Sequence, residues 1–199
     1  MTRSNDSHFD RAYYARFYEN PRTRVSDARQ VERLAGFVSA YLDYLGIRVQ
    51  RILDLGCGMG LWQAPLARAF PRARYVGVEY STYLCERLGW THGSVVDYRA
   101  AKPFDLVVCQ GVLPYLSAAD ARRALANLGK LCRGALYLEA VTREDGTDGV
   151  LDATRTDAGM QLRPRSFYLR GLAPQFVPAG GGVFVARSAG VPLYALERT

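Results

Sequence analysis

Apolar positions along the chain follow two periods, one typical of helices and the other of buried strands. Aromatic residues recur every four positions from Phe9 to Phe17, which predicts a short helix that ends at Asn20. A longer helix is predicted from Ser26, a good N-cap, to Gly46, because the apolar residues between them fall on one side.

After this second helix the pattern changes to short apolar runs separated by helical segments. The runs predicted as strands are 51–55, 74–80, 90–93, 104–110 and 134–141. The predicted helices between them are 62–70, 81–89 and 117–131. Continuous apolar strands that alternate with helices indicate an α/β fold, with a mostly parallel sheet covered on both faces.

The last quarter of the chain has a different pattern. Segment 142–159 is polar and rich in Asp, Thr and Gly, so a long loop is expected there. Two apolar runs, 182–188 and 191–197, are separated by Gly190 and predict a closing antiparallel hairpin. Neither a repeat nor a linker interrupts the chain, so a single domain over 1–199 is expected.

Composition narrows the class of protein. The chain is 49% hydrophobic and 23% charged, as in ordinary globular proteins, and its apolar runs fall short of the roughly 20 residues of a membrane span. No signal-peptide pattern is seen at the N-terminus, so we expect a cytoplasmic protein. The four cysteines and two histidines are widely spaced, and neither a metal site nor a disulfide framework is expected. The net charge of +7 comes from scattered arginines and does not establish a nucleic-acid partner.

The stretch ILDLGCGMG, at 52–60, places three glycines directly after a predicted buried strand. Gly56, Gly58 and Gly60 indicate a sharp turn or a close approach to a ligand, because glycine otherwise weakens a fold. In open α/β sheets, ligands bind at this edge of the strands. A dinucleotide fingerprint would need a glycine where Leu61 stands, which argues against a nicotinamide cofactor.

Asp54 and the three glycines match the motif E/D-x-G-x-G-x-G, and the chain therefore resembles class I S-adenosylmethionine-dependent methyltransferases. The family's later features follow in order over about half the chain: Glu79 after the second strand, Ser94 and Val95 after the third, and FDLVVCQGVLPYL at the fourth. The resemblance implies a Rossmann-like, doubly wound, seven-stranded sheet, mostly parallel, with a C-terminal antiparallel hairpin. It also implies N-terminal lid helices within 1–46 and a cofactor-binding core over 47–199.

The resemblance also implies which residues contact S-adenosylmethionine. They are Asp54, Gly56, Gly58, Gly60, Glu79, Tyr80, Ser94, Val95 and Gln110. Glu79 is expected to accept both ribose hydroxyls, and Asp54 to stabilise the glycine loop through its backbone amides. Ser94 stands where the family often has an acid, so the adenine contact is left open between Ser94 and Asp97.

The methyl acceptor is less clearly encoded. Methyl transfer is an in-line displacement for which a base is optional, so no catalytic residue is predicted. The sequence lacks both the N/D-P-P-Y/F loop and the Pro-Cys pair of two classes of nucleic-acid methylases. The fourth-strand motif instead resembles small-molecule methyltransferases, and the residues expected on the acceptor side are Tyr14, Tyr18, Tyr115 and Arg143.

In that branch of the family, N-terminal helices fold over the cofactor, and the aromatic segment before Asn20 is expected to act as such a lid. His8 is expected in a disordered tail and His92 in ordinary packing. Two other functions remain open. One is an RNA or protein methyltransferase of the same fold, and the other is a cofactor-binding module without catalysis.

Overall fold

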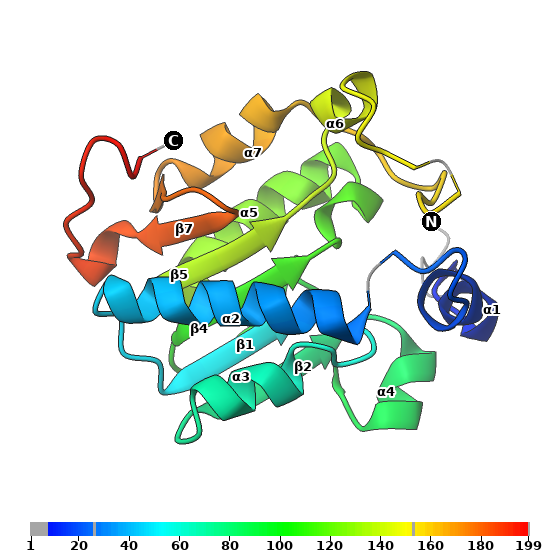
Figure 1. The fold of residues 1–199 in the computed structure, drawn as a ribbon, viewed down its shortest axis with the longest axis horizontal. Coiled ribbons are helices and arrows are strands. Elements are labelled where there is room, and N and C mark those ends of the chain that lie inside the picture. The colour runs from blue at the N-terminus through cyan, green and yellow to red at the C-terminus, as the bar shows by residue number, and fades with distance from the viewer. Residues whose placement is uncertain (1–7, 26, 153, 199) are drawn as a thin grey trace.

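The computed structural model describes residues 8–198 except 26 and 153, and these residues form one seven-stranded sheet flanked by helices (Figure 1). The strands are β1 (Arg51–Leu55), β2 (Arg74–Glu79), β3 (Thr91–His92), β4 (Phe104–Gln110), β5 (Cys132–Glu139), β6 (Phe176–Pro178) and β7 (Val183–Ala186). Their order is β3-β2-β1-β4-β5-β7-β6. β1 to β5 pair in parallel, and β7 is antiparallel to both β5 and β6. The predicted Rossmann-like α/β sheet is confirmed.

Two layers of helices cover the sheet. The α-helices are α1 (Arg11–Tyr14), α2 (Ala28–Tyr44), α3 (Gln63–Ala69), α4 (Thr82–Leu88), α5 (Ala118–Leu131), α6 (Arg143–Thr147) and α7 (Arg165–Leu172). The short turns are the π-helical η2 (Ala15–Glu19) and the 3-10 turns η3 (Leu113–Tyr115) and η4 (Arg187–Ala189). α2 and α3 pack in a core cluster with one face of the sheet, and α5 and α7 pack in a second cluster with the other. This is the doubly wound arrangement.

Helix ends are encoded locally. The α4 and α5 helices begin at Ser81 and Ser117, whose hydroxyls accept the N–H groups of Leu84 and Asp120. The cap of α2 is Asp27, whose carboxylate accepts the N–H of Gln30. The predicted cap, Ser26, lies outside the described residues.

The predicted N-terminal cap over 1–46 consists of two parts with different roles. In α2, Val31, Val38 and Leu42 are buried with Ile52 and Leu106 of the sheet, so this helix belongs to the core rather than to a lid. The segment 8–19, by contrast, lies beyond the strand ends, beside α4 (Figure 1). A lid role therefore fits the aromatic segment alone.

The C-terminal hairpin exists, and β7 lies within the predicted strand 182–188, but the predicted second strand was wrong. β7 pairs with β6, which precedes it, and 191–197 forms no strand. The reason is the run Gly180–Gly182, whose φ angles of 83°, 57° and 80° make the turn in a region that L side chains avoid. Leu196 is consequently 98% exposed. The predicted loop 142–159 also begins with the short helix α6, which Thr142 and Asp145 start with a capping box.

Candidate active site

Two neighbouring cavities lie at the carboxyl ends of the parallel strands. The strand order reverses at β1, whose neighbours are β2 and β4, and ligands of open α/β sheets bind outside that point. The first cavity, of about 510 Å³, is bounded by Glu79, Ser94, Val95, Phe9 and Leu116. The second, of about 380 Å³, is bounded by Asp54, Trp62, Glu139, Leu151 and Arg155. Both volumes suit small-molecule sites.

Several residues line both cavities. The boundary that they form between the two cavities is called the passage below. These residues are Tyr13, Tyr18, Gly56, Gly58, Gln110, Gly111 and Tyr115. The passage thus combines the glycine loop after β1, the end of β4 and the aromatic N-terminal segment. A ligand that extends from one cavity into the other would cross the glycine loop.

Two glycines of the loop are required by geometry. A β-carbon at Gly56 would collide with the Val112 side chain, and the φ of Gly56 is +76°. A β-carbon at Gly58 would meet only the carbonyl oxygen of Gly56, at 4.0 Å, although its φ of +51° also disfavours L side chains. Because Gly58 lines both cavities, the space that it leaves free belongs to the site.

Gly60 is explained by packing instead. It lines neither cavity, and a β-carbon there would lie 2.7 Å from Cζ2 of Trp90. The Trp90 indole Nε1 in turn donates to the carbonyl oxygen of Gly58 at 3.0 Å. Gly60 therefore makes room for the Trp90 ring that packs against the glycine loop, whereas the family motif had placed Gly60 among the cofactor contacts.

Glu79 connects the end of β2 to the glycine loop. Its Oε2 accepts the N–H of Gly58 at 2.8 Å, and its Oε1 accepts the N–H groups of Tyr80 and Ser81, each at 2.9 Å. The side chain is buried but lines the first cavity. Since a carboxylate oxygen has two lone pairs, Oε2 retains one for a ligand hydroxyl.

Asp54 lies at the floor of the second cavity, 1% exposed. Burial raises its pKa to about 7, against the lowering effect of the Tyr75 hydroxyl, which donates to its Oδ2 at 2.6 Å. Among the described residues, its hydrogen-bond partner is this phenol and not an amide of the glycine loop, so that expectation was wrong. Asp54 is a buried acid whose ionised form destabilises the folded state relative to its protonated form.

The far wall of the first cavity carries the residues expected near adenine. Ser94, Val95 and Asp97 all line it, and Val95 is buried. The Ser94 hydroxyl accepts the N–H of Val96 at 3.2 Å. Tyr80 lines the same cavity and stacks on His92, with ring centroids 6.1 Å apart. The choice between Ser94 and Asp97 stays open, because both reach the cavity.

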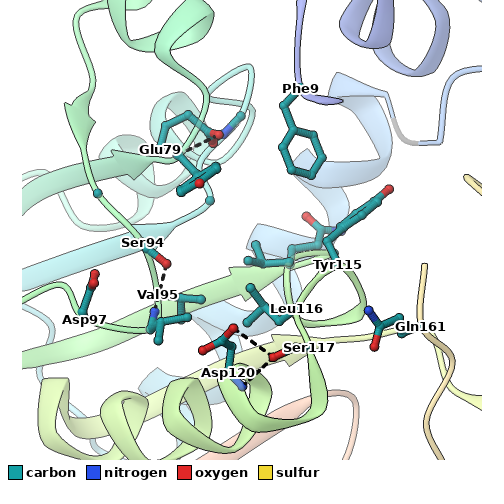
Figure 2. A pocket seen from close by; sticks show the side chains of 18 of the residues that line it. Phe9, Glu79, Ser94, Val95, Asp97, Tyr115, Leu116, Ser117, Asp120 and Gln161 are labelled. Carbon is teal, nitrogen blue, oxygen red and sulfur yellow. Dashed lines mark hydrogen bonds between the residues drawn. The ribbon is translucent and has the colours of Figure 1, made fainter. Parts of the chain in front are cut away.

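The aromatic N-terminal segment forms the opposite wall. Figure 2 shows Phe9 and Tyr115 across the cavity from Glu79 and Ser94. Tyr14 and Tyr18, expected on the acceptor side, line the first cavity, and their ring centroids are 5.5 Å apart. Tyr14 is nevertheless buried within this aromatic cluster.

Three contacts tie this segment to the rest of the site. The Tyr13 hydroxyl is 2.8 Å from that of Tyr115, and the Ser81 hydroxyl donates to the carbonyl oxygen of Phe9. His8 Nε2 lies 2.7 Å from Oδ2 of Asp157, so His8 belongs to the rim of the site and the expectation of a disordered position was wrong.

Asp157 in turn links His8 to Tyr115. Partial burial works to raise the pKa of Asp157, but hydrogen bonds from the Gly159 amide, His8 and Tyr115 hold it below its ordinary value. The Asp157 carboxylate is therefore charged and accepts these three hydrogen bonds. It joins the loop after α6 to the N-terminal segment across the opening of the cavities.

The predicted acceptor-side residue Arg143 is not brought to the site. It is exposed at the first turn of α6, and it lines neither cavity. A buried arginine that the sequence pattern missed, Arg163, instead donates to the carbonyl oxygens of Leu113 and Leu116. It thereby holds the turn that carries Tyr115, and no sequence motif marked it.

The described residues contain no group of three or more His, Cys, Asp or Glu side chains that could hold a metal ion. Cys57, Cys109 and Cys132 are buried free thiols. No helix in the described part of the chain is long and apolar enough to span a membrane.

Comparisons with known proteins agree with this geometry. Residues 53–134 match the family model described as a methyltransferase domain. The chain is 30% identical over 119 residues to trans-aconitate 2-methyltransferase of Pseudomonas paraeruginosa, a match that covers 56% of this chain and 39% of the relative. It is 43% identical over 53 residues to malonyl-[acyl-carrier protein] O-methyltransferase of Legionella pneumophila, a match that covers 25% of this chain and 19% of the relative. The chain thus matches well under half the length of these relatives.

Solved structures share the whole fold. An amino pentose methyltransferase of Micromonospora echinaspora, solved with S-adenosylmethionine bound, superposes with a TM-score of 0.61 at 19% identity, covering 89% of this chain and 97% of that one. A magnesium protoporphyrin IX methyltransferase of Synechocystis, with bound S-adenosylhomocysteine, superposes with a TM-score of 0.59 at 18% identity, covering 86% and 87%.

The fold is that of the class I S-adenosylmethionine-dependent methyltransferases. Residues 53–134, which run from β1 into β5 and include the glycine loop and Glu79, are the part of the chain that matches the methyltransferase-domain family model.

The residues present fit the cofactor that this fold binds. Gly58 leaves space between the two cavities, and Glu79 retains a lone pair toward the first cavity. Val95 supplies an apolar wall. Glu79 and Val95 would therefore hold a nucleoside with vicinal hydroxyls and a flat base if one is bound in the first cavity.

Proposed function

We propose that the protein transfers a methyl group from S-adenosylmethionine to a small-molecule acceptor. The observation that carries this proposal is Glu79, a buried carboxylate that binds the N–H of Gly58 and still lines the cavity beside it. Glu79 would bind the ribose hydroxyls, and Val95 with Ser94 or Asp97 would hold the adenine.

When bound, S-adenosylmethionine supplies an electrophilic methyl group. The chain's own contribution is to place an acceptor against it and to exclude water. Tyr13, Tyr18 and Tyr115 surround the passage between the cavities, and burial raises the pKa of each phenol above its ordinary value, so all three stay protonated. Alignment by these walls is sufficient for an in-line displacement.

The second cavity suits a small acceptor better than a macromolecule. Its walls include Leu61, Trp62, Leu151 and Met160, and the segment 8–19 closes over the neighbouring cavity. The names of two structural neighbours, an amino pentose methyltransferase and a magnesium protoporphyrin IX methyltransferase, describe those proteins, but they support a small-molecule acceptor for this fold. We further propose a reducing compartment such as the cytoplasm, because Cys57, Cys109 and Cys132 are buried free thiols.

The experiment is calorimetric titration of the purified chain with S-adenosylhomocysteine and, separately, with NAD. We expect S-adenosylhomocysteine to bind at micromolar affinity and NAD to be silent, because Leu61 stands where a dinucleotide site has glycine. A radiolabelled methyl-donor screen over metabolite and RNA pools then identifies the acceptor. NAD binding without S-adenosylhomocysteine binding would overturn the proposal.

A further inference from the structure

Three carboxylates line the second cavity, those of Asp54, Glu139 and Asp152, and the exposed side chain of Glu139 is oriented by two neutral partners. Glu139, at the carboxyl end of β5, accepts hydrogen bonds at Oε2 from the Tyr137 hydroxyl at 3.0 Å and from Gln110 Nε2 at 3.1 Å. Both partners are neutral, so they orient the carboxylate without cancelling its charge. The ion pairs found among the described residues do not include Glu139.

The orientation of Gln110 is itself determined. Trp62 Nε1 donates to Gln110 Oε1 at 2.8 Å, and an indole nitrogen can only donate. The amide oxygen therefore faces Trp62 and the amide nitrogen faces Glu139. Trp62 is only 3% exposed, so its hydrogen bond to Gln110 is shielded from water, whereas the Glu139 carboxylate, which Gln110 contacts at Oε2, is exposed. Oε1 is the oxygen left for a ligand.

The arginine on this cavity is outnumbered by carboxylates. Arg155 lines it, and its Nε lies 3.5 Å from Oδ2 of Asp152, which lines the same cavity with Asp54 and Glu139. An acceptor that carries a carboxylate would therefore meet Glu139 without an available counter-charge, whereas a cationic or N–H-donating acceptor would find a complementary group.

The passage beside the second cavity also favours a positively charged ligand. Tyr13, Tyr18 and Tyr115 line it, and the faces of phenol rings attract cations. An ammonium group close to these rings and to Glu139 would be stabilised from two sides. The apolar walls formed by Leu61, Leu151 and Met160 suit the rest of such a molecule.

We propose that the methyl acceptor is an amine carried on an apolar body, and that Glu139 determines this specificity; the inference rests on the methyltransferase function proposed above. The bound ammonium first loses one proton to water. The neutral amine then uses its lone pair to form the new N–C bond, while the donor's C–S bond breaks and its electron pair stays on sulfur. The methylated nitrogen is again cationic opposite Glu139.

The test measures binding and therefore does not depend on turnover. The chain is saturated with S-adenosylhomocysteine and titrated with a library of matched pairs, in which one apolar body carries either an aminomethyl group or a carboxylate. 3-Phenylpropylamine and 3-phenylpropanoate are one such pair. We expect amines to bind at least about tenfold more tightly than their partners, the effect of one charge-assisted hydrogen bond.

Glu139→Gln should remove this preference while S-adenosylhomocysteine affinity stays at the parent value. Glu86→Gln, on the exposed side of α4, removes the same charge outside the cavities and should leave the preference intact. If no amine in the library binds preferentially, or if the preference survives Glu139→Gln, the amine inference fails. Failure to bind S-adenosylhomocysteine would instead refute the proposed function, so the two failures are distinguishable.

Discussion

Glu79 and Gly58 are joined across the crevice by a hydrogen bond of 2.8 Å from the Gly58 amide to the Glu79 carboxylate. The acid at the end of β2 thereby holds the glycine loop that follows β1. Cofactor affinity and loop geometry are consequently linked through one side chain.

Glu79→Ala should weaken S-adenosylhomocysteine binding by about 1–3 kcal/mol, because a hydrogen bond to a charged acceptor is lost. It should also lower the free energy of unfolding, since the amides of Gly58, Tyr80 and Ser81 lose their acceptor. Glu79→Gln separates the two effects: it keeps a carbonyl acceptor but removes the charge. Calorimetry and urea unfolding give both quantities, with Asp120→Asn on the cavity rim as the control. Parental affinity in both Glu79 variants would place the cofactor elsewhere.

Gly58→Val should abolish cofactor binding while the sheet stays folded. The added side chain would occupy the space between the cavities, where the Gly56 carbonyl oxygen at 4.0 Å is the nearest obstacle. Gly46→Val is a matched control, because Gly46 has a φ of +68° with no atom within 4 Å of a β-carbon and lies outside both cavities. Both variants should lose similar stability in urea unfolding. Equal loss of binding in the two would show that backbone strain, not occlusion, is responsible.

The segment up to Asn20 should behave as a lid that becomes protected when cofactor binds. Deleting residues 1–20 should leave the core folded, because α2 holds the sheet independently, but it should reduce cofactor affinity and remove turnover. Hydrogen exchange with and without S-adenosylhomocysteine measures this directly. Identical protection of residues 9–19 in both states would reduce the segment to ordinary packing.

The closed position of this segment should depend on pH through Asp157. Its pKa is lowered in the folded protein by the Gly159 amide, His8 and Tyr115, so its contribution is present above the ordinary carboxyl pKa of about 4 and is lost as pH falls through the lower folded value. Asp157→Asn should therefore increase exchange of residues 9–19 at neutral pH and remove the acid dependence. Unchanged exchange in this variant would show that Asp157 does not hold the segment.

The free energy of unfolding should depend on pH through Asp54, in the direction opposite to that expected for Asp157. Burial raises its pKa to about 7, so the folded state binds a proton more tightly than the unfolded state. Stability from this group is present below pH 4 and is lost as pH rises through about 7, by on the order of 4 kcal/mol in total. Asp54→Asn should flatten the decline in urea stability between pH 5 and pH 8. Tyr75→Phe should move the midpoint of this decline to higher pH, since the Tyr75 phenol favours the charged form of the Asp54 carboxylate. A decline that persists in Asp54→Asn would locate the titrating group elsewhere.

The order of strands and helices could be predicted from the sequence because its signals are local. Ser81 and Ser117 cap helices through amides three residues ahead, and the apolar run 106–109 indicates a strand buried on both faces. Gly56 and Gly58 were recognisable because their backbone conformations exclude other residues. Gly60 shares that conformation, but a local motif does not distinguish a cofactor contact from a contact with Trp90.

The sequence by itself determined the class of sheet, the position of the glycine loop and the acid that follows β2, since each depends on neighbours within a few positions. Only the tertiary structure decided which distant groups meet. Tyr13 reaches Tyr115 across 102 positions and His8 reaches Asp157 across 149, and neither pair has a periodic signal. The same holds for Glu139, which β5 places beside Gln110 of β4. Such contacts depend on the order in which strands pair, and that order follows from burying both faces of the sheet at once.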